Sequence, residues 1–116
     1  MKRILIVEDE DAQRLLYKEE LSELGYEIQL ASDGDEALQQ VKKQRPDLVI
    51  LDIRMPGKSG FEVLQEMLND QPRVPVIINT AYSHYKEHFM SWAADEYIVK
   101  SADLTELKKT IKKILK

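Results

Sequence analysis

Acidic residues directly follow two short apolar runs of the sequence. Glu8 and Asp9 follow the run 4–7, and Asp52 follows the run 48–51. Three carboxylates that lie close together repel one another and raise their own pKa values unless a cation sits between them. Oxygen ligands without His or Cys favour a hard ion such as Mg²⁺. The pattern therefore indicates a magnesium site around these three carboxylates.

A hydroxyl and an amine follow two further apolar runs. The run 76–78 continues to Thr80, and the run 97–99 continues to Lys100. The lysine is a point cation that suits a carboxylate or a phosphoryl oxygen, and the threonine hydroxyl can donate a hydrogen bond to the same group. A metal ion, a lysine and a hydroxyl around Asp52 would hold a transferring phosphoryl group.

The elements that must position these residues alternate between strand-like and helix-like segments. Five runs rich in β-branched residues or leucine have the length of strands, at residues 4–7, 26–31, 48–51, 76–78 and 97–99. Apolar residues recur at helical spacing between them, with Gly25 ending the first helix and capping boxes starting at Asp33 and Asp103. This alternation predicts an α/β fold, a doubly wound five-stranded parallel sheet with helices on both faces. Ligands of such sheets bind beyond the carboxyl ends of the strands, where the polar residues would meet.

Length and composition restrict the class of protein. The 116 residues are enough for one domain, and 43% hydrophobic residues can form a real core. The absence of cysteine excludes a disulfide scaffold, a thiolate zinc site and a cysteine nucleophile. A net charge of −4 argues against nucleic-acid binding. We find no membrane-length apolar run and no signal peptide, so we expect a cytoplasmic protein that does not bind membranes.

Four motifs of the sequence occur in the order found in one known family. They are ILIVEDE at residues 4–10, PDLVILDIRMPG at residues 46–57, the pair Thr80 and Ala81, and DEYIVK at residues 95–100. With these motifs the chain resembles the receiver domain of bacterial two-component response regulators over essentially its whole length. The resemblance implies a flavodoxin-like sheet with the strand order 2-1-3-4-5. It also implies a single receiver domain over residues 1–116, without an output domain in this chain.

The resemblance implies a function in phosphotransfer. Asp52 would be the phosphoacceptor, taking a phosphoryl group from a phosphohistidine of a histidine kinase or of a histidine phosphotransfer protein. Glu8, Asp9, Asp52 and the backbone carbonyl of Arg54 would bind Mg²⁺ or Mn²⁺. The chain would be a signalling switch rather than an enzyme, catalysing only its own phosphotransfer and slow autodephosphorylation.

The resemblance also implies how the signal leaves the site. Lys100, Thr80 and the backbone of Ala81 would bind the phosphoryl group. Thr80 and Tyr97 would form a switch pair that alters the surface of the fourth helix, the fifth strand and the fifth helix. That surface would control a downstream protein partner or an output domain, and it would be the contact of a homodimer if one forms. We expect a weaker response at Tyr17, because the first helix lies far from this surface in the sheet order.

An aromatic stripe precedes the last strand. Tyr85, Phe89 and Trp92 share one face of the predicted fourth helix. Amphipathicity favours packing of this stripe in the core, and the alternative is that part of it is an exposed anchor for a partner. His84 and His88 have a spacing compatible with metal binding, but no third ligand is evident.

Three other classes of protein fit the sequence less well. A flavodoxin-like electron carrier needs a loop that binds phosphate after the first strand, where the acidic residues 8–11 would repel it. An aspartate-nucleophile phosphatase has Asp-x-Asp at this place, whereas residues 52–54 read Asp-Ile-Arg. A receiver-like domain that is not phosphorylated would not need the complete set of acidic residues, threonine and lysine.

Overall fold

Five parallel strands form one sheet in the order β2-β1-β3-β4-β5. The computed structural model of the chain describes residues 1–53, 60–69, 74–82 and 94–116. The strands are β1 (Arg3–Val7), β2 (Glu27–Ala31), β3 (Leu48–Leu51), β4 (Val76–Thr80) and β5 (Glu96–Val99). The helices are α1 (Asp11–Ser22), α2 (Gly34–Lys43), α3 (Gly60–Leu68) and α5 (Thr105–Ile114). The helix expected to carry the aromatic stripe lies outside the described residues.

The five predicted strands are confirmed, with ends that differ by at most two residues. The strands β1 and β3 pair in the middle of the sheet from Ile4↔Leu48 to Val7↔Leu51. Their residues in this register are buried, because helices cover the sheet on both faces. The strand β4 extends to Asn79 and Thr80, because both residues pair with β5. The polar residues at the end of β4 are thus part of the sheet itself.

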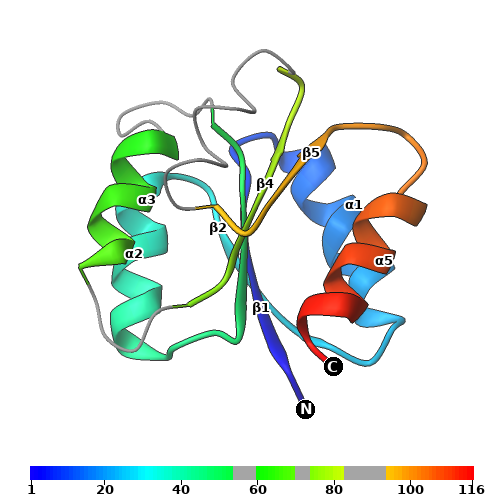
Figure 1. Cartoon of the computed structure of the whole chain (residues 1–116), viewed down its shortest axis with the longest axis horizontal. Helices are drawn as coiled ribbons and strands as arrows, with labels where there is room; N and C mark the ends of the chain where they lie inside the picture. The colour runs from blue at the N-terminus through cyan, green and yellow to red at the C-terminus, as the bar shows by residue number, and fades with distance from the viewer. Residues whose placement is uncertain (54–59, 70–73, 83–93) are drawn as a thin grey trace.

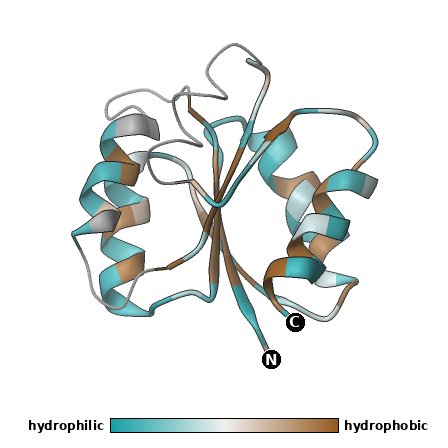
Figure 2. Cartoon of the chain, viewed as in Figure 1, coloured by the Kyte–Doolittle hydropathy of each residue, from teal (hydrophilic) through white to brown (hydrophobic). Residues whose placement is uncertain are grey.

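The helices lie in two layers, with α1 and α5 on one face of the sheet and α2 and α3 on the other (Figure 1). Alternate strand residues point to opposite faces, so each face has its own core. Ile4 and Ile6 belong to the core under α1 and α5, whereas Leu5 and Val7 belong to the core under α2 and α3. Figure 2 shows largely hydrophobic central strands and helices whose outer sides are hydrophilic.

Helix ends confirm two of the sequence signals and correct a third. Gly25 has a φ of 93° after α1, a conformation that favours glycine. The Asp33 carboxylate accepts a hydrogen bond of 2.8 Å from the Glu36 N–H and caps α2. The capping box predicted at Asp103 is wrong, because α5 begins one residue later with Leu104 at its N-cap. Asp103 instead accepts hydrogen bonds from the backbone and the hydroxyl of Thr105.

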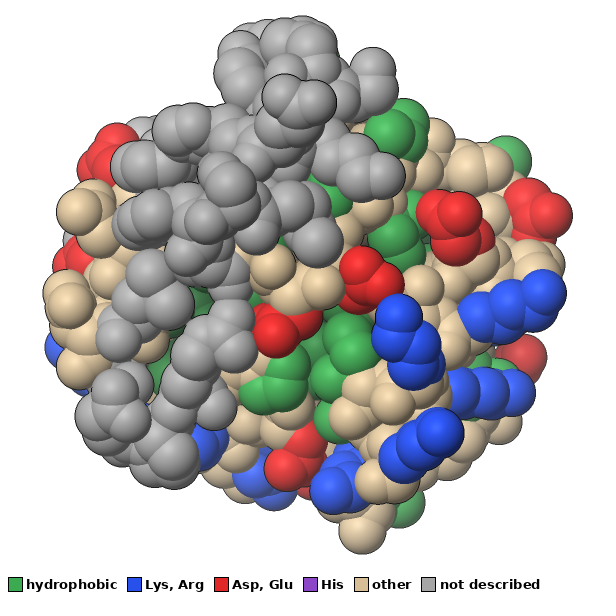
Figure 3. All heavy atoms as spheres, in the orientation of Figure 1, with side chains coloured by type: hydrophobic (Ala, Val, Ile, Leu, Met, Phe, Trp, Pro, Cys, Tyr) green, Lys and Arg blue, Asp and Glu red, His purple; other side chains and the backbone are tan. Residues whose placement is uncertain are grey.

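Charge is distributed unevenly over the surface. Residues 101–116 contain five lysines, and Figure 3 shows basic side chains gathered on the side of the molecule where α5 lies. Lys108 forms an ion pair of 2.7 Å with Glu20 of α1, and Lys113 forms one of 3.1 Å with Glu96 of β5. Among the described residues, no helix combines the length and the apolar character that crossing a bilayer requires.

Candidate functional site

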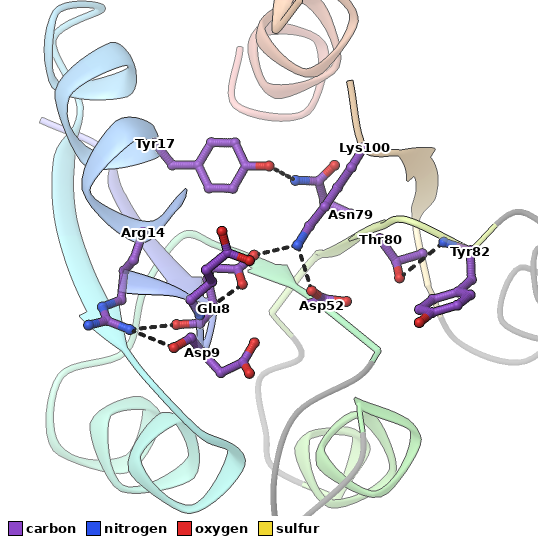
Figure 4. A network of polar contacts seen from close by, with 10 residues as sticks. Glu8, Asp9, Arg14, Tyr17, Asp52, Asn79, Thr80, Tyr82 and Lys100 are labelled. Carbon is purple, nitrogen blue, oxygen red and sulfur yellow. Dashed lines mark hydrogen bonds and ion pairs between the residues drawn. The ribbon is translucent and has the colours of Figure 1, made fainter. Parts of the chain in front are cut away.

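Four strands deliver polar side chains to one edge of the sheet. Glu8 and Asp9 follow β1, Asp52 follows β3, Thr80 ends β4 and Lys100 follows β5. These strands are parallel neighbours, and the pairs Val7↔Leu51, Leu51↔Ile78 and Thr80↔Val99 set their register near this edge. The carboxyl ends therefore meet, and Figure 4 shows the Lys100 amine between Glu8 and Asp52, with the Thr80 hydroxyl turned toward the Tyr82 N–H.

Three carboxylates converge at this edge. One oxygen from each of Glu8, Asp9 and Asp52 lies within 4.8 Å of the others. Glu8 and Asp52 are 2% and 7% exposed, whereas Asp9 is open to solvent. Carboxylate oxygens are the ligands of a hard divalent cation, and one exposed member leaves room for the water that Mg²⁺ retains. The described residues thus fit a magnesium ion, as the sequence predicts.

Lys100 joins two of the carboxylates. Its Nζ donates to Glu8 Oε1 and to Asp52 Oδ2, each over 2.7 Å. Burial lowers the pKa of Lys100, but hydrogen bonds to Asp52 and then to Glu8 outweigh it and raise this pKa to about 12. Burial also raises the pKa of Glu8, and the hydrogen bond from Lys100 opposes that shift. Lys100 therefore carries its full charge at neutral pH, beside the carboxylate predicted to accept the phosphoryl group.

The turn between β1 and α1 is held by groups that sequence reasoning missed. Glu8 Oε2 accepts a hydrogen bond of 3.1 Å from the Glu10 N–H. Arg14 Nη1 donates to the carbonyl oxygens of Glu8 and Asp9, at 2.9 and 3.4 Å, and Nη2 pairs with Asp11. A basic residue in the first turns of the helix after four acidic residues is a signal that could have indicated Arg14.

Gly60 is a second residue that sequence reasoning missed. A Cβ atom there would lie 2.6 Å from Ile53 Cα and 2.8 Å from the Asp52 carbonyl oxygen. The Gly60 N–H also donates to the Ile53 carbonyl over 2.8 Å. The start of α3 therefore packs directly against the backbone that carries Asp52, at a distance that only glycine allows.

The expected switch pair lies on the α2 and α3 side of the sheet. Thr80 is fully buried, and its Oγ1 accepts a hydrogen bond of 3.5 Å from the Tyr82 N–H. Tyr97 is also buried, and its hydroxyl donates to the Tyr82 carbonyl. Both residues of the pair thus contact Tyr82, in the segment that leaves β4. Ala81 lies between Thr80 and Tyr82 in this segment and is exposed.

The expectation that Tyr17 lies far from the switch is wrong. Its hydroxyl accepts a hydrogen bond of 3.0 Å from Asn79 Nδ2, and both side chains are buried. Asn79 precedes Thr80 on β4 and points to the opposite face of the sheet. The Tyr17 ring reaches β4 because α1 packs on that face, which the order of strands alone does not reveal. Burial raises the pKa of Tyr17, and the hydrogen bond from Asn79 opposes that shift.

Several expected site residues lie outside the described part of the chain. They are the backbone carbonyl of Arg54, the stripe of Tyr85, Phe89 and Trp92, and the histidines His84 and His88. Their parts in metal binding or in a partner surface stay predictions.

Comparisons with known proteins agree with this geometry. The family profile of the response regulator receiver domain matches residues 4–112. The structure of the response regulator TrrA from Thermotoga maritima, in complex with Mg²⁺ and BeF, has 54% sequence identity and a TM-score of 0.93. The match covers 98% of this chain and 99% of the TrrA chain. TrrA in complex with the histidine kinase ThkA has 53% identity and a TM-score of 0.91, and the match covers 100% of both chains.

Relatives known from sequence extend beyond the matched region. The probable transcriptional regulator ycf27 of Porphyridium aerugineum is 38% identical over 117 residues, which cover 99% of this chain and 48% of that protein. The chain thus spans about half the length of such curated relatives. A profile match over most of the chain, the sheet order and the likeness to TrrA lead to one conclusion. The chain belongs to the response regulator receiver domain family and is a signalling switch domain of two-component systems.

Proposed function

We propose that Asp52 accepts a phosphoryl group from a phosphohistidine of a partner protein. The observation that carries this proposal is the position of Asp52, 2.7 Å from the Lys100 amine and within 4.8 Å of Glu8 and Asp9. One Glu8 oxygen accepts a hydrogen bond from Lys100, and the other accepts one from the Glu10 N–H. These contacts fix the orientation of the side chain, which suits a residue that binds a cation. Asp9 is exposed and completes the set of ligands.

The reaction needs positioning more than acid–base chemistry. An oxygen of the Asp52 carboxylate forms a bond to phosphorus while the bond from phosphorus to the donor nitrogen breaks. The donor imidazole keeps that electron pair and leaves as a neutral ring, because its other nitrogen already carries a proton. The product is an acyl phosphate on Asp52. Lys100 stays charged and can follow the new phosphoryl oxygens.

The metal supplies charge neutralisation at the same place. Mg²⁺, or Mn²⁺ in its stead, would offset the negative charge of the phosphoryl oxygens when bound by Glu8, Asp9, Asp52 and the carbonyl of Arg54. The burial of Glu8 and Asp52 supports this assignment, because a buried pair of carboxylates beside one lysine retains excess negative charge. The same set would carry the slow loss of the phosphoryl group to water.

The phosphoryl group acts on the rest of the domain through Thr80. A phosphoryl group on Asp52 offers acceptor oxygens to the Thr80 hydroxyl and to the Ala81 backbone. Movement of Thr80 would shift Tyr82, and Tyr97 would respond because its hydroxyl binds the Tyr82 carbonyl. Such a signal biases an equilibrium between two states that already exist.

The output surface includes β5 and α5 together with the fourth helix. Val99 is a large hydrophobic residue of β5 that is 43% exposed, and β5 is an edge strand of the sheet. An exposed apolar residue on this edge supports a contact with a downstream protein, an output domain or a second copy of the chain.

The donor protein would dock on α1. Leu15 and Leu16 are 55% and 44% exposed, although large apolar side chains are usually covered. A shallow hollow of about 330 Å³ lies beside Leu16 and is lined by Leu16, Tyr17, Lys100 and Ala102, among others. Since this hollow reaches Lys100, a protein seated on α1 would present its histidine to Asp52. The complex of TrrA with the kinase ThkA supports a histidine kinase as donor, and a histidine phosphotransfer protein has the same reactive group.

Intact-mass measurement tests the assignment of Asp52. The chain is incubated with Mg²⁺ and phosphoramidate, a small phosphodonor. We expect the mass of one phosphoryl group to be added to the wild type and to Asp35→Asn, which removes an exposed carboxyl of α2. Asp52→Asn keeps the shape of the side chain but lacks the nucleophile, so it should gain nothing. An equal gain in Asp52→Asn would refute the assignment.

A further inference from the structure

Arg14 binds the backbone behind the acidic cluster. Its Nη1 donates to the carbonyl oxygens of both Glu8 and Asp9, while Nη2 pairs with Asp11. Its own N–H donates to the Glu10 carbonyl over 2.9 Å, so the side chain starts from the first turn of α1. Figure 4 shows the guanidinium on the side of this turn away from Lys100 and Asp52.

We propose that Arg14 is a positioning residue for the metal site. By holding the carbonyls of Glu8 and Asp9 on one side of the turn, it directs their side chains to the other side, toward Asp52. The planar guanidinium offers several donors in a fixed geometry, whereas the ammonium of a lysine is a single flexible point. This proposal rests on the proposed function, because it assumes that the three carboxylates bind Mg²⁺.

The contacts distinguish positioning from a simple effect of charge. Arg14 carries a positive charge near a site for a divalent cation, so loss of that charge alone would strengthen Mg²⁺ binding. Loss of the two hydrogen bonds has the opposite effect, because the freed turn lets the like-charged carboxylates move apart. Arg14→Lys keeps the positive charge and loses the planar guanidinium with its several donors. The two explanations therefore predict opposite signs for Arg14→Gln, and only positioning predicts a loss for Arg14→Lys.

Calorimetric titration with Mg²⁺ tests the proposal on the purified chain. Partners that orient metal ligands typically contribute 10–100-fold to affinity, so we expect the Kd to rise about tenfold in Arg14→Lys and Arg14→Gln. Lys18→Gln is the matched control, because it removes the same charge from an exposed position one turn along α1. Its Kd should stay the same or fall slightly. Thermal melts without Mg²⁺ show whether each variant is folded, and Arg14→Lys decides if Arg14→Gln is not.

The outcomes of the titration distinguish the positioning role of Arg14 from the proposed function. Unchanged or tighter Mg²⁺ binding in Arg14→Lys overturns the positioning role. If the wild type still gains a phosphoryl group on Asp52, the proposed function survives that result. A wild type that binds no Mg²⁺ at all overturns both proposals.

Discussion

Two neighbouring residues of β4 point to opposite faces of the sheet, and each has a buried tyrosine near it. Asn79 faces α1 and α5, where its amide donates to the Tyr17 hydroxyl. Thr80 faces α2 and α3, and Tyr97 lies in the core on that face. The Tyr17 hydroxyl binds a side chain of the sheet, whereas the Tyr97 hydroxyl binds a backbone carbonyl beyond the end of β4.

The difference indicates which face of the sheet stabilises the fold and which face changes when the switch responds. Tyr17 and Asn79 are anchored in a helix and a strand, so their hydrogen bond holds two rigid elements together. Tyr97 binds a segment outside the regular elements, which can change position without breaking the sheet. We therefore expect the Asn79 face to contribute more to stability and the Thr80 face to contribute more to the switch.

Loss of Asn79 should give the largest effect on stability. Asn79→Ala leaves the buried Tyr17 hydroxyl without this donor and removes packed atoms, so we expect a loss of about 2–3 kcal/mol in the free energy of unfolding. Urea unfolding of the variant and of Thr80→Ala measures both sides of the comparison. A smaller loss for Asn79→Ala than for Thr80→Ala would reverse the assignment of the two faces.

A pH series on Tyr17→Phe should show a smaller effect that depends on ionisation. The variant leaves the Asn79 amide without its acceptor, which should cost about 1–2 kcal/mol at pH 7. Because burial raises the pKa of Tyr17, the unfolded chain loses this proton first as the pH rises above about 10. The wild type then loses the stability that the neutral Tyr17 hydroxyl provides, which Tyr17→Phe lacks at every pH. We expect the stability difference to shrink between pH 9 and about 11, and a constant difference would contradict the burial of this hydroxyl.

Thr80→Ala should cost less stability than Asn79→Ala and still uncouple the switch. The substitution removes a hydroxyl and a buried methyl group, which together cost about 1–2 kcal/mol. With Mg²⁺ and beryllofluoride, we expect the ring signals of Tyr97 in NMR spectra to move more than those of Tyr17 in the wild type. Tyr26, at the opposite end of the sheet, is the control and should move least. If Tyr97 responds equally in Thr80→Ala, the route through Thr80 is wrong.

The ion pair between α1 and α5 should contribute least. Lys108 and Glu20 have side chains that are 28% and 36% exposed, and such surface pairs contribute about 0.5 kcal/mol. Lys108→Met should therefore change the free energy of unfolding only slightly, and the change should vanish in high salt. A loss above about 2 kcal/mol would mean that this pair, rather than the buried contacts of α1, holds the Asn79 face together.

Local sequence pattern was enough to predict the strands and the acidic edge. The runs that became β1 and β3 are apolar throughout, which only strands covered on both faces tolerate. In a parallel sheet all strands end at the same edge, so Glu8, Asp9, Asp52 and Lys100 had to meet once the strands were assigned. The distances within this group confirm that prediction. The strand order came from the resemblance, since alternation alone allows several orders.

Only the tertiary structure decided which side chains hold the site from behind. Periodicity determines which residues share a face, but it does not determine where a helix lies along the sheet or how far a long side chain reaches. The bond between Tyr17 and Asn79 joins residues 62 positions apart in the sequence, and it depends on the placement of α1. Arg14 reaches the Glu8 and Asp9 carbonyls because the first turn of α1 lies close to the end of β1. Gly60 packs on Ile53 because the start of α3 lies close to the backbone that follows β3. Those distances exist only in the folded chain, so the residue types that follow each strand could identify the site but not its supports.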